Sequence, residues 1–217
     1  MIKNDILTEK LKELSRVLTT ILDYTNKDEI IKSWDTLNKA YRKLMGINSS
    51  MAINLSYSDL MKFIGAYESP ETVNLVVTGK LLKVHAYLCS IQGDEVSALS
   101  QSVKSAEILI NALLSDFETA IDLCLDDIDE IINVISEYEI PLDCKYLIFK
   151  YYEAITRFDK AEDYLFEMRE QNKESDFIKE EGEKFYEKLL TLPETVLEKG
   201  NLPIDEVKDS LESFRKI

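Results

Sequence analysis

The first 45 residues carry apolar side chains that recur every three or four positions, the spacing of a narrow helix-pairing seam. The first seam consists of Leu7, Leu11, Leu14, Leu18 and Ile21. The second has the same steps and consists of Ile30, Trp34, Leu37, Tyr41 and Leu44. Polar residues 24–27 lie between the two seams, and Gly46 is a typical helix stop. The pattern predicts an antiparallel helical hairpin over residues 4–45.

A polar stretch at residues 47–57 separates this hairpin from the rest of the chain, and we expect a linker there. A short helix is expected near 58–66. Ser69 and Pro70 then form a strong helix start, with serine at the cap and proline at the first helical position. We therefore predict two domains, an N-terminal helical hairpin over 1–46 and a larger helical domain over 56–217.

The larger domain shows helical spacing throughout. We expect successive helices near 70–91, 94–114, 116–125, 127–138, 143 onward, 159–170, 174–190 and 204–215. Asp94, Asp116 and Asp127 are predicted to cap three of them. No segment alternates apolar and polar residues as a strand does, and 6 Gly and 4 Pro in 217 residues leave few turns for a β architecture. The predicted fold class is all-α.

A weak internal repeat favours stacked helical hairpins. Ala98 follows the Gly93 turn by five residues, and Ala161 follows the aromatic Phe158 by three. Tetratricopeptide-type hairpins use a small residue in this way, because it lets the second helix approach the first closely. The two alanines are 63 residues apart, which is two units of about 32. The midpoint at 129–130 has no small residue, so we predict tetratricopeptide-like hairpins with a distorted middle unit; an irregular α bundle is the alternative.

Several segments also resemble a known family. They are MIKND at 1–5, YYE at 151–153, AEDYLFE at 161–167, FYEKLL at 185–190 and GNLPIDEV at 200–207. Through them the chain is similar to a family of uncharacterised bacterial proteins with a tetratricopeptide-like helical body. That family has no established activity, so the resemblance implies a fold and no catalytic residue.

Charge narrows the choice of partners. The chain has 26 basic and 41 acidic residues, a formal net charge of −15, which repels a phosphate backbone and argues against a nucleic-acid partner. The imbalance is uneven. Residues 1–50 carry 9 basic and 7 acidic residues, a net +2, whereas residues 101–200 carry 11 and 25, a net −14.

Location is predicted from hydropathy and cysteine content. No apolar run approaches the ~18 residues that span a bilayer, and the N-terminus lacks a signal-like apolar core. We therefore expect a cytoplasmic protein with no membrane partner. Cys89, Cys124 and Cys144 lie among apolar neighbours and are predicted to be reduced core thiols.

No residue set converges on catalysis. His85 is the only histidine and shares a helical face with apolar residues, where a general base or a metal ligand could sit. Leu82 occupies the glutamate position of a Glu-x-x-His metal motif, so we interpret His85 as a packing residue. The sequence around Gly79 lacks the earlier glycine and the following hydroxyl of a phosphate-binding loop. We predict no catalytic residue, no cofactor and no metal, and therefore no enzyme.

Five residues are predicted to bind a partner. Three belong to the densest carboxylate cluster, which fails as a calcium loop because an isoleucine and a tyrosine replace the turn glycine and the bidentate glutamate. Two adjacent tyrosines point about 100° apart on a helix, so we expect one to be exposed. The five residues are Asp126, Asp127, Glu130, Tyr151 and Tyr152. A solvated acidic face and an ordinary aromatic core are the alternatives.

The favoured hypothesis is a non-catalytic interaction or scaffold protein whose acidic helical surface receives a basic or amphipathic segment. The alternative is a homo-oligomer assembled through residues 4–45, and an enzyme with a pocket around His85 is a third hypothesis. The basic hairpin could also dock electrostatically on the acidic body through Lys39, Arg42 and Lys43, or pack by its apolar seams alone.

Overall fold

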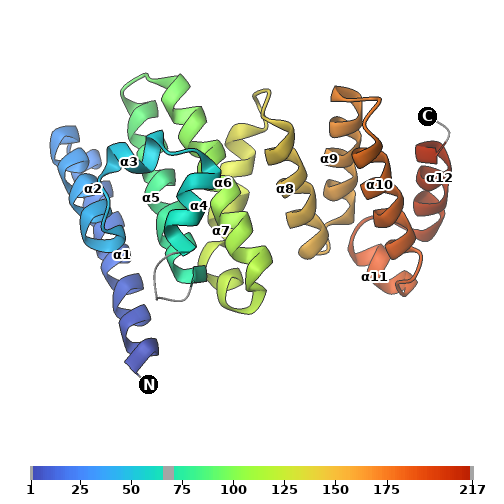
Figure 1. Ribbon diagram of the computed structural model, residues 1–217, viewed down its shortest axis with the longest axis horizontal. Coiled ribbons are helices and arrows are strands. Elements are labelled where there is room, and N and C mark those ends of the chain that lie inside the picture. Colours follow the sequence, from blue (N-terminus) through green and yellow to red (C-terminus); the bar gives the residue numbers. More distant parts are fainter. Residues whose placement is uncertain (1, 66–70, 216–217) are drawn as a thin grey trace. The chain divides into compact units, whose positions relative to one another are not determined.

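The computed structural model describes residues 2–65 and 71–215, and all regular secondary structure within these ranges is helical (Figure 1). The predicted all-α class is confirmed. The chain divides into two compact units, Met1–Glu139 and Ile140–Ile217. The first unit therefore contains both the predicted hairpin domain and the beginning of the predicted domain at 56–217.

The first unit contains seven helices among its described residues. They are α1 (Ile2–Asn26), α2 (Ile30–Met45), α3 (Ser49–Asn54), α4 (Tyr57–Gly65), α5 (Glu71–Ile91), α6 (Glu95–Ser115) and α7 (Phe117–Ile135). The second unit contains five in the part that the structure describes. They are α8 (Leu142–Ala154), α9 (Phe158–Gln171), α10 (Asp176–Leu189), α11 (Glu194–Lys199) and α12 (Ile204–Arg215).

The N-terminal hairpin forms as the two seams predict. Helices α1 and α2 pack together, and Leu14, Ile21 and Leu37 of the seams are buried. Gly46 takes a left-handed conformation with φ 67° and donates its N–H to the Arg42 carbonyl, which ends α2. The hairpin also packs against α5, so part of its apolar surface is covered by its own chain.

The segment after the hairpin is packed, so the predicted linker at 47–57 is wrong. Asn48 accepts a hydrogen bond from the Met51 amide at 2.8 Å and caps α3. Ala52 is fully buried. The ammonium group of Lys104 on α6 donates to the carbonyls of Ile53 and Leu55 at 2.7 and 2.8 Å. The polar residues of this segment include the cap of α3, and its backbone carbonyls accept hydrogen bonds from a lysine of α6.

Long helices follow, with starts that are partly as predicted. Asp94 and Asp116 accept from the amides of Ser97 and Thr119 and cap α6 and α7. The predicted break before Asp127 is wrong, because α7 continues through this residue. The Asp127 carboxylate is paired with lysines of α5 instead of capping a helix. The predicted cap at 69–70 lies outside the described residues.

Helices α5 and α6 approach each other closely at Gly79. A Cβ at this position would lie 2.5 Å from the Leu109 side chain, so only glycine leaves room for the leucine. The Ser105 hydroxyl donates to the Gly79 carbonyl at 2.7 Å and closes the same contact. The glycine therefore serves helix packing.

In the second unit, α8 pairs with α9 and α10 pairs with α12. Their shared core is rich in aromatic rings, including Phe149, Phe158 and Phe185. The Gly200 carbonyl, at the end of the unpredicted helix α11, accepts from the Asp159 amide at 3.1 Å.

The helices between 71 and 171 do not recur at the expected spacing of about 32 residues. Helices α5, α6 and α7 have 21, 21 and 19 residues, whereas α8 and α9 have 13 and 14. The pair α5 and α6, with 21 residues in each helix, already takes more chain than a unit of about 32 residues contains. The two alanines that suggested the repeat, Ala98 and Ala161, are both buried.

Candidate functional site

The first unit has a mostly apolar groove of about 230 Å³ between α5, α6 and α7. Ala86 and Ala98 are buried in its floor, and their small side chains leave it hollow. Larger apolar side chains form its walls, Tyr87 from α5, Leu99 from α6 and Val134 from α7. The groove therefore draws on three helices that are consecutive in the chain.

The walls of the groove are exposed to an unusual degree for side chains of this size. Tyr87 is 42% exposed, Val134 is 56% exposed and Tyr138 is 44% exposed. Val134 lies in the last turn of α7, and Tyr138 lies in the bend three residues past the end of this helix; both line the groove. Each therefore has apolar surface that a bound side chain could cover.

An acidic ridge runs along α7, next to the groove. Between positions 116 and 139 the sequence has acidic residues and no basic one: Asp116, Glu118, Asp122, Asp126, Asp127, Asp129, Glu130, Glu137 and Glu139. Glu118, Asp122, Asp126 and Glu130 are exposed and four positions apart, so they follow one face of the helix. Glu130 also lines the groove, which joins the ridge to the apolar wall.

Two lysines of α5 neutralise part of this ridge. Lys80 and Lys83 contact the Asp127 carboxylate at 2.8 and 2.6 Å, and Lys83 also pairs with Glu130. Burial disfavours the charged form of Asp127, but the two ammonium groups outweigh it and hold the pKa of this carboxyl below its ordinary value. Asp127 therefore serves to join α7 to α5, while the exposed Asp122 and Asp126 lie further along the ridge.

The five predicted partner-binding residues are divided between the two units. Asp126, Asp127 and Glu130 lie on α7, whereas Tyr151 and Tyr152 lie on α8. The expectation that one of the tyrosines is exposed is wrong, because both are buried. The Tyr152 ring lies 5.1 Å from Tyr151 and 5.8 Å from Tyr164 of α9, so the adjacent tyrosines share an aromatic cluster.

His85 lies in the contact between α2 and α5, away from the walls of the groove. It is 7% exposed, and its ring centroid lies 4.8 Å from Trp34 and 6.3 Å from Tyr41. Burial lowers the pKa of His85 to about 4. Its Nδ1 atom has no hydrogen-bond partner among the described residues. These surroundings match the predicted packing role.

The family of the chain follows from a comparison of its whole length. A family model described as "Family of unknown function (DUF6483)" matches residues 1–217. The chain belongs to this family. The predicted membership in an uncharacterised family is thereby confirmed. No curated protein and no solved structure matches the chain.

Within the part of this DUF6483 protein that the structure describes, no group of three or more His, Cys, Asp or Glu side chains could hold a metal ion. None of its described helices is both long and apolar enough to cross a membrane. Cys89, Cys124 and Cys144 are buried and are not joined by disulfides, as predicted.

The walls of the groove were missed by sequence reasoning. Tyr87, Val134 and Tyr138 were not singled out as binding residues from the sequence. In α7 the buried stripe runs through Cys124, Ile128, Ile131 and Ile135, and Val134 lies beside this stripe.

Proposed function

We propose that this DUF6483 protein is a non-catalytic interaction protein, and that its α5–α6–α7 groove binds an amphipathic helical segment with a basic face. The observation that carries the proposal is the position of an exposed apolar groove beside an acidic ridge that has no basic residue of its own. The groove would receive apolar side chains, and the ridge would face the basic ones.

The apolar half of the proposal rests on exposure. Contiguous exposed apolar surface on a soluble domain often marks an interaction site, and tyrosines are frequent binding hot spots because they bury a large area at small entropic cost. Tyr87 and Tyr138 supply such rings at the groove. An amphipathic helix commonly binds a groove of this kind through apolar anchors spaced three or four residues apart.

The charged half rests on Asp122 and Asp126. Both are exposed, and neither has an ion pair among the described residues, in contrast to Asp127. A basic segment would therefore meet unpaired carboxylates along α7. Opposite charge raises the rate of encounter, and salt weakens it as the Debye length falls to ~8 Å at physiological ionic strength.

The non-catalytic part of the proposal is supported by the surroundings of His85. The side chain that general acid–base or metal chemistry would most readily use is buried between aromatic rings. We therefore expect His85→Ala to change stability and to leave peptide binding at the groove unaltered.

A peptide selection tests the proposal. Random peptides displayed on phage would be selected on the full chain at low salt, and the enriched peptides measured by fluorescence anisotropy. We expect enrichment of lysine and arginine together with apolar residues at helical spacing. Val134→Glu should weaken the best peptide at least about tenfold, because it places a charge in the apolar wall. Asp122→Lys with Asp126→Lys should also weaken it and reduce its salt dependence.

Two matched variants control for unspecific effects. Val96→Glu changes a valine of α6 that is 82% exposed and outside the groove lining, and Asp205→Lys reverses an exposed charge in the second unit. Both should bind the peptide as the unaltered chain does. Enrichment of acidic peptides, or equal weakening by Val134→Glu and Val96→Glu, would contradict the proposal.

Fewer observations support the alternative function, homo-oligomerisation through residues 4–45. The seams of α1 and α2 are largely buried within the chain, while Leu22 and Ile31 remain exposed at 50% and 86%. Mass measurement in solution, with Ile31→Glu as the variant, tests this alternative. A dimer that Ile31→Glu converts to a monomer would favour it.

A tetratricopeptide-like arrangement of the hairpins is also part of the proposal. Ala98 and Ala161 support it, because each is a buried small residue in the second helix of a packed pair. An experimental structure of the full chain tests the arrangement directly.

A further inference from the structure

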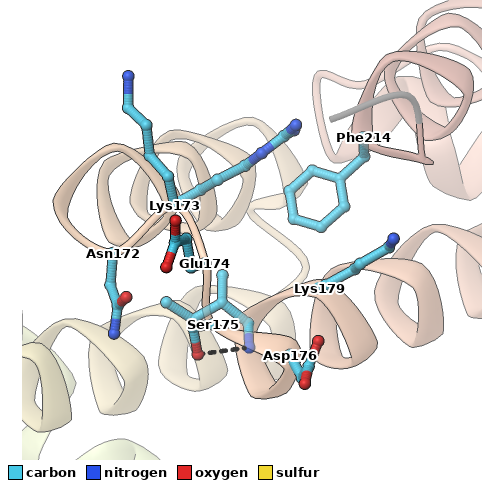
Figure 2. A pocket seen from close by; sticks show the side chains of 9 residues that line it. Asn172, Lys173, Glu174, Ser175, Asp176, Lys179 and Phe214 are labelled. Atoms are coloured by element: carbon cyan, nitrogen blue, oxygen red, sulfur yellow. Dashed lines mark hydrogen bonds between the residues drawn. The ribbon is translucent and has the colours of Figure 1, made fainter.

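The second unit has a separate hollow of about 200 Å³ where α9 ends and α10 begins (Figure 2). Arg169 from the last turn of α9, Phe214 from α12 and the residues around the start of α10 line it. Its lining is mainly polar, unlike that of the α5–α6–α7 groove. All of its residues belong to one compact unit.

Arg169 is the unusual member of this lining. Its side chain is 8% exposed, and neither terminal guanidinium nitrogen has a hydrogen-bond partner among the described residues. An arginine keeps its positive charge at any ordinary pH. A buried charge without a partner is strongly destabilising. An anion that accepted hydrogen bonds from this side chain would remove that cost.

The guanidinium group is held over a fixed aromatic ring. Its Cζ atom lies 4.4 Å from the centroid of Phe214, which is 1% exposed. Phe214 in turn fits closely against Gly182, where a Cβ would lie 2.2 Å from the ring. The Tyr186 ring also packs against Phe214, and their ring centroids are 5.8 Å apart. The ring lies against the guanidinium group, whose two terminal nitrogens are buried and have no acceptor among the described residues.

The start of α10 provides further attraction for an anion. The Ser175 hydroxyl accepts from the Ile178 amide, as the dashed line in Figure 2 shows, and the helix dipole of this 14-residue helix places partial positive charge here. Lys179 lines the same hollow, as does Lys173, which pairs with Glu170 at 3.1 Å. Glu174 and Asp176 line it as well, and Figure 2 shows the Asp176 carboxylate pointing away from Phe214.

The balance of charge in this lining is opposite to that of its surroundings. Arg169, Lys173 and Lys179 against Glu174 and Asp176 give a net +1. Residues 140–217 as a whole have 13 basic and 19 acidic residues, a net −6. A positive site is therefore built into an acidic unit.

The geometry points to a binding site for a small phosphate-bearing anion at this hollow, with Arg169 as its principal ligand. A guanidinium fork matches two oxygens of a phosphate group, and helix N-termini bind the same group. The volume lies below the ~300 Å³ of sites for drug-sized ligands, which fits inorganic phosphate or a small phosphate monoester. The site is independent of the peptide groove, since it lies in the other unit.

Calorimetric titration of the full chain with inorganic phosphate, and separately with methyl phosphate, tests the inference at constant chloride. We expect saturable binding that Arg169→Gln weakens at least about tenfold, the loss expected from a charge-assisted contact. Lys179→Gln should weaken binding by a smaller factor. Arg157→Gln is the matched control, because Arg157 precedes the opposite end of α9 and is 46% exposed.

Circular dichroism checks that Arg169→Gln is folded, and Lys179 is exposed, so its substitution provides a second test that does not disturb the core. Equal weakening by Arg157→Gln and Arg169→Gln would overturn the site in favour of general attraction by surface cations. The absence of saturable binding of either anion to the unaltered chain would overturn it as well. Tighter binding of methyl phosphate than of free phosphate would assign a monoester ligand, and the reverse order would assign inorganic phosphate.

Discussion

Protonation of His85 should destabilise the contact between the N-terminal hairpin and α5. The imidazole is buried between Trp34 and Tyr41, and burial lowers its pKa from 6.5 to about 4. In the unfolded chain the same group titrates near its ordinary value. The folded state therefore binds a proton less readily than the unfolded state.

The sign and size of the effect follow from this difference. Above pH ~6.5 the imidazole is neutral in both states, so its contribution to stability is complete there. As the pH falls towards about 4, only the unfolded state gains a proton, and the free energy of unfolding decreases. Each pKa unit corresponds to about 1.4 kcal/mol, so the loss is about 2 kcal/mol near pH 5.

Urea unfolding at about pH 7 and about pH 5 measures this loss. Trp34 is the only tryptophan and lies against His85, so its fluorescence reports on the first unit. The unaltered chain should lose about 2 kcal/mol more than His85→Gln between the two conditions, because carboxylate titration is common to both chains. Equal losses would refute the reasoning.

A direct titration provides an independent check. The chain has one histidine, so its imidazole gives a single set of proton resonances. We expect a midpoint near pH 4 in the folded protein, and a midpoint near the ordinary pKa of about 6.5 would show that burial does not disfavour the charged form.

Three further predictions concern packing and charge. Gly79→Ala should lower stability by about 1–3 kcal/mol in thermal unfolding, since its Cβ would overlap the facing leucine of α6. Asp127→Asn should lower the free energy of urea unfolding by about 1–2 kcal/mol, because it leaves Lys80 unpaired and leaves Lys83 with Glu130 as its remaining partner. Reversal of Lys39, Arg42 and Lys43 to glutamate should change stability by less than about 1 kcal/mol and leave the hairpin in place at low and high salt, as limited proteolysis would show.

Local patterns in the sequence predicted many of the helices and their ends, because the residues that set each of them lie within or next to that helix. The seam of α2 gives the helix, and Gly46 gives its end, without any reference to the rest of the chain. Asp94 and Asp116 likewise cap helices within three residues of their own positions. Asp127 resembled these two, but its partners are lysines 44 and 47 positions earlier, which no local pattern contains.

The groove and the anion site depend on such distant contacts. Tyr87, Leu99 and Val134 come together only because α5, α6 and α7 pack as they do. Arg169 has the sequence environment of an ordinary helix-terminal arginine, and its isolation becomes visible only when Phe214 is placed over it. Sequence reasoning predicted helices at both places but could not predict which faces would remain uncovered.

The charged residues of the hairpin and those of α7 differ in how far the chain itself neutralises them. In the hairpin, Lys39 pairs with Asp35 and Lys43 pairs with Glu13, so these cations are satisfied within α1 and α2. The hairpin meets α5 through buried apolar and aromatic groups, including Tyr41, and through Lys10, whose ammonium group donates to the Asn74 side chain at 2.6 Å. On α7 the carboxylates outnumber the available lysines, and the excess is exposed. The α7 ridge therefore keeps a negative charge that its own chain does not neutralise, and this is the charge that the proposed basic segment would meet.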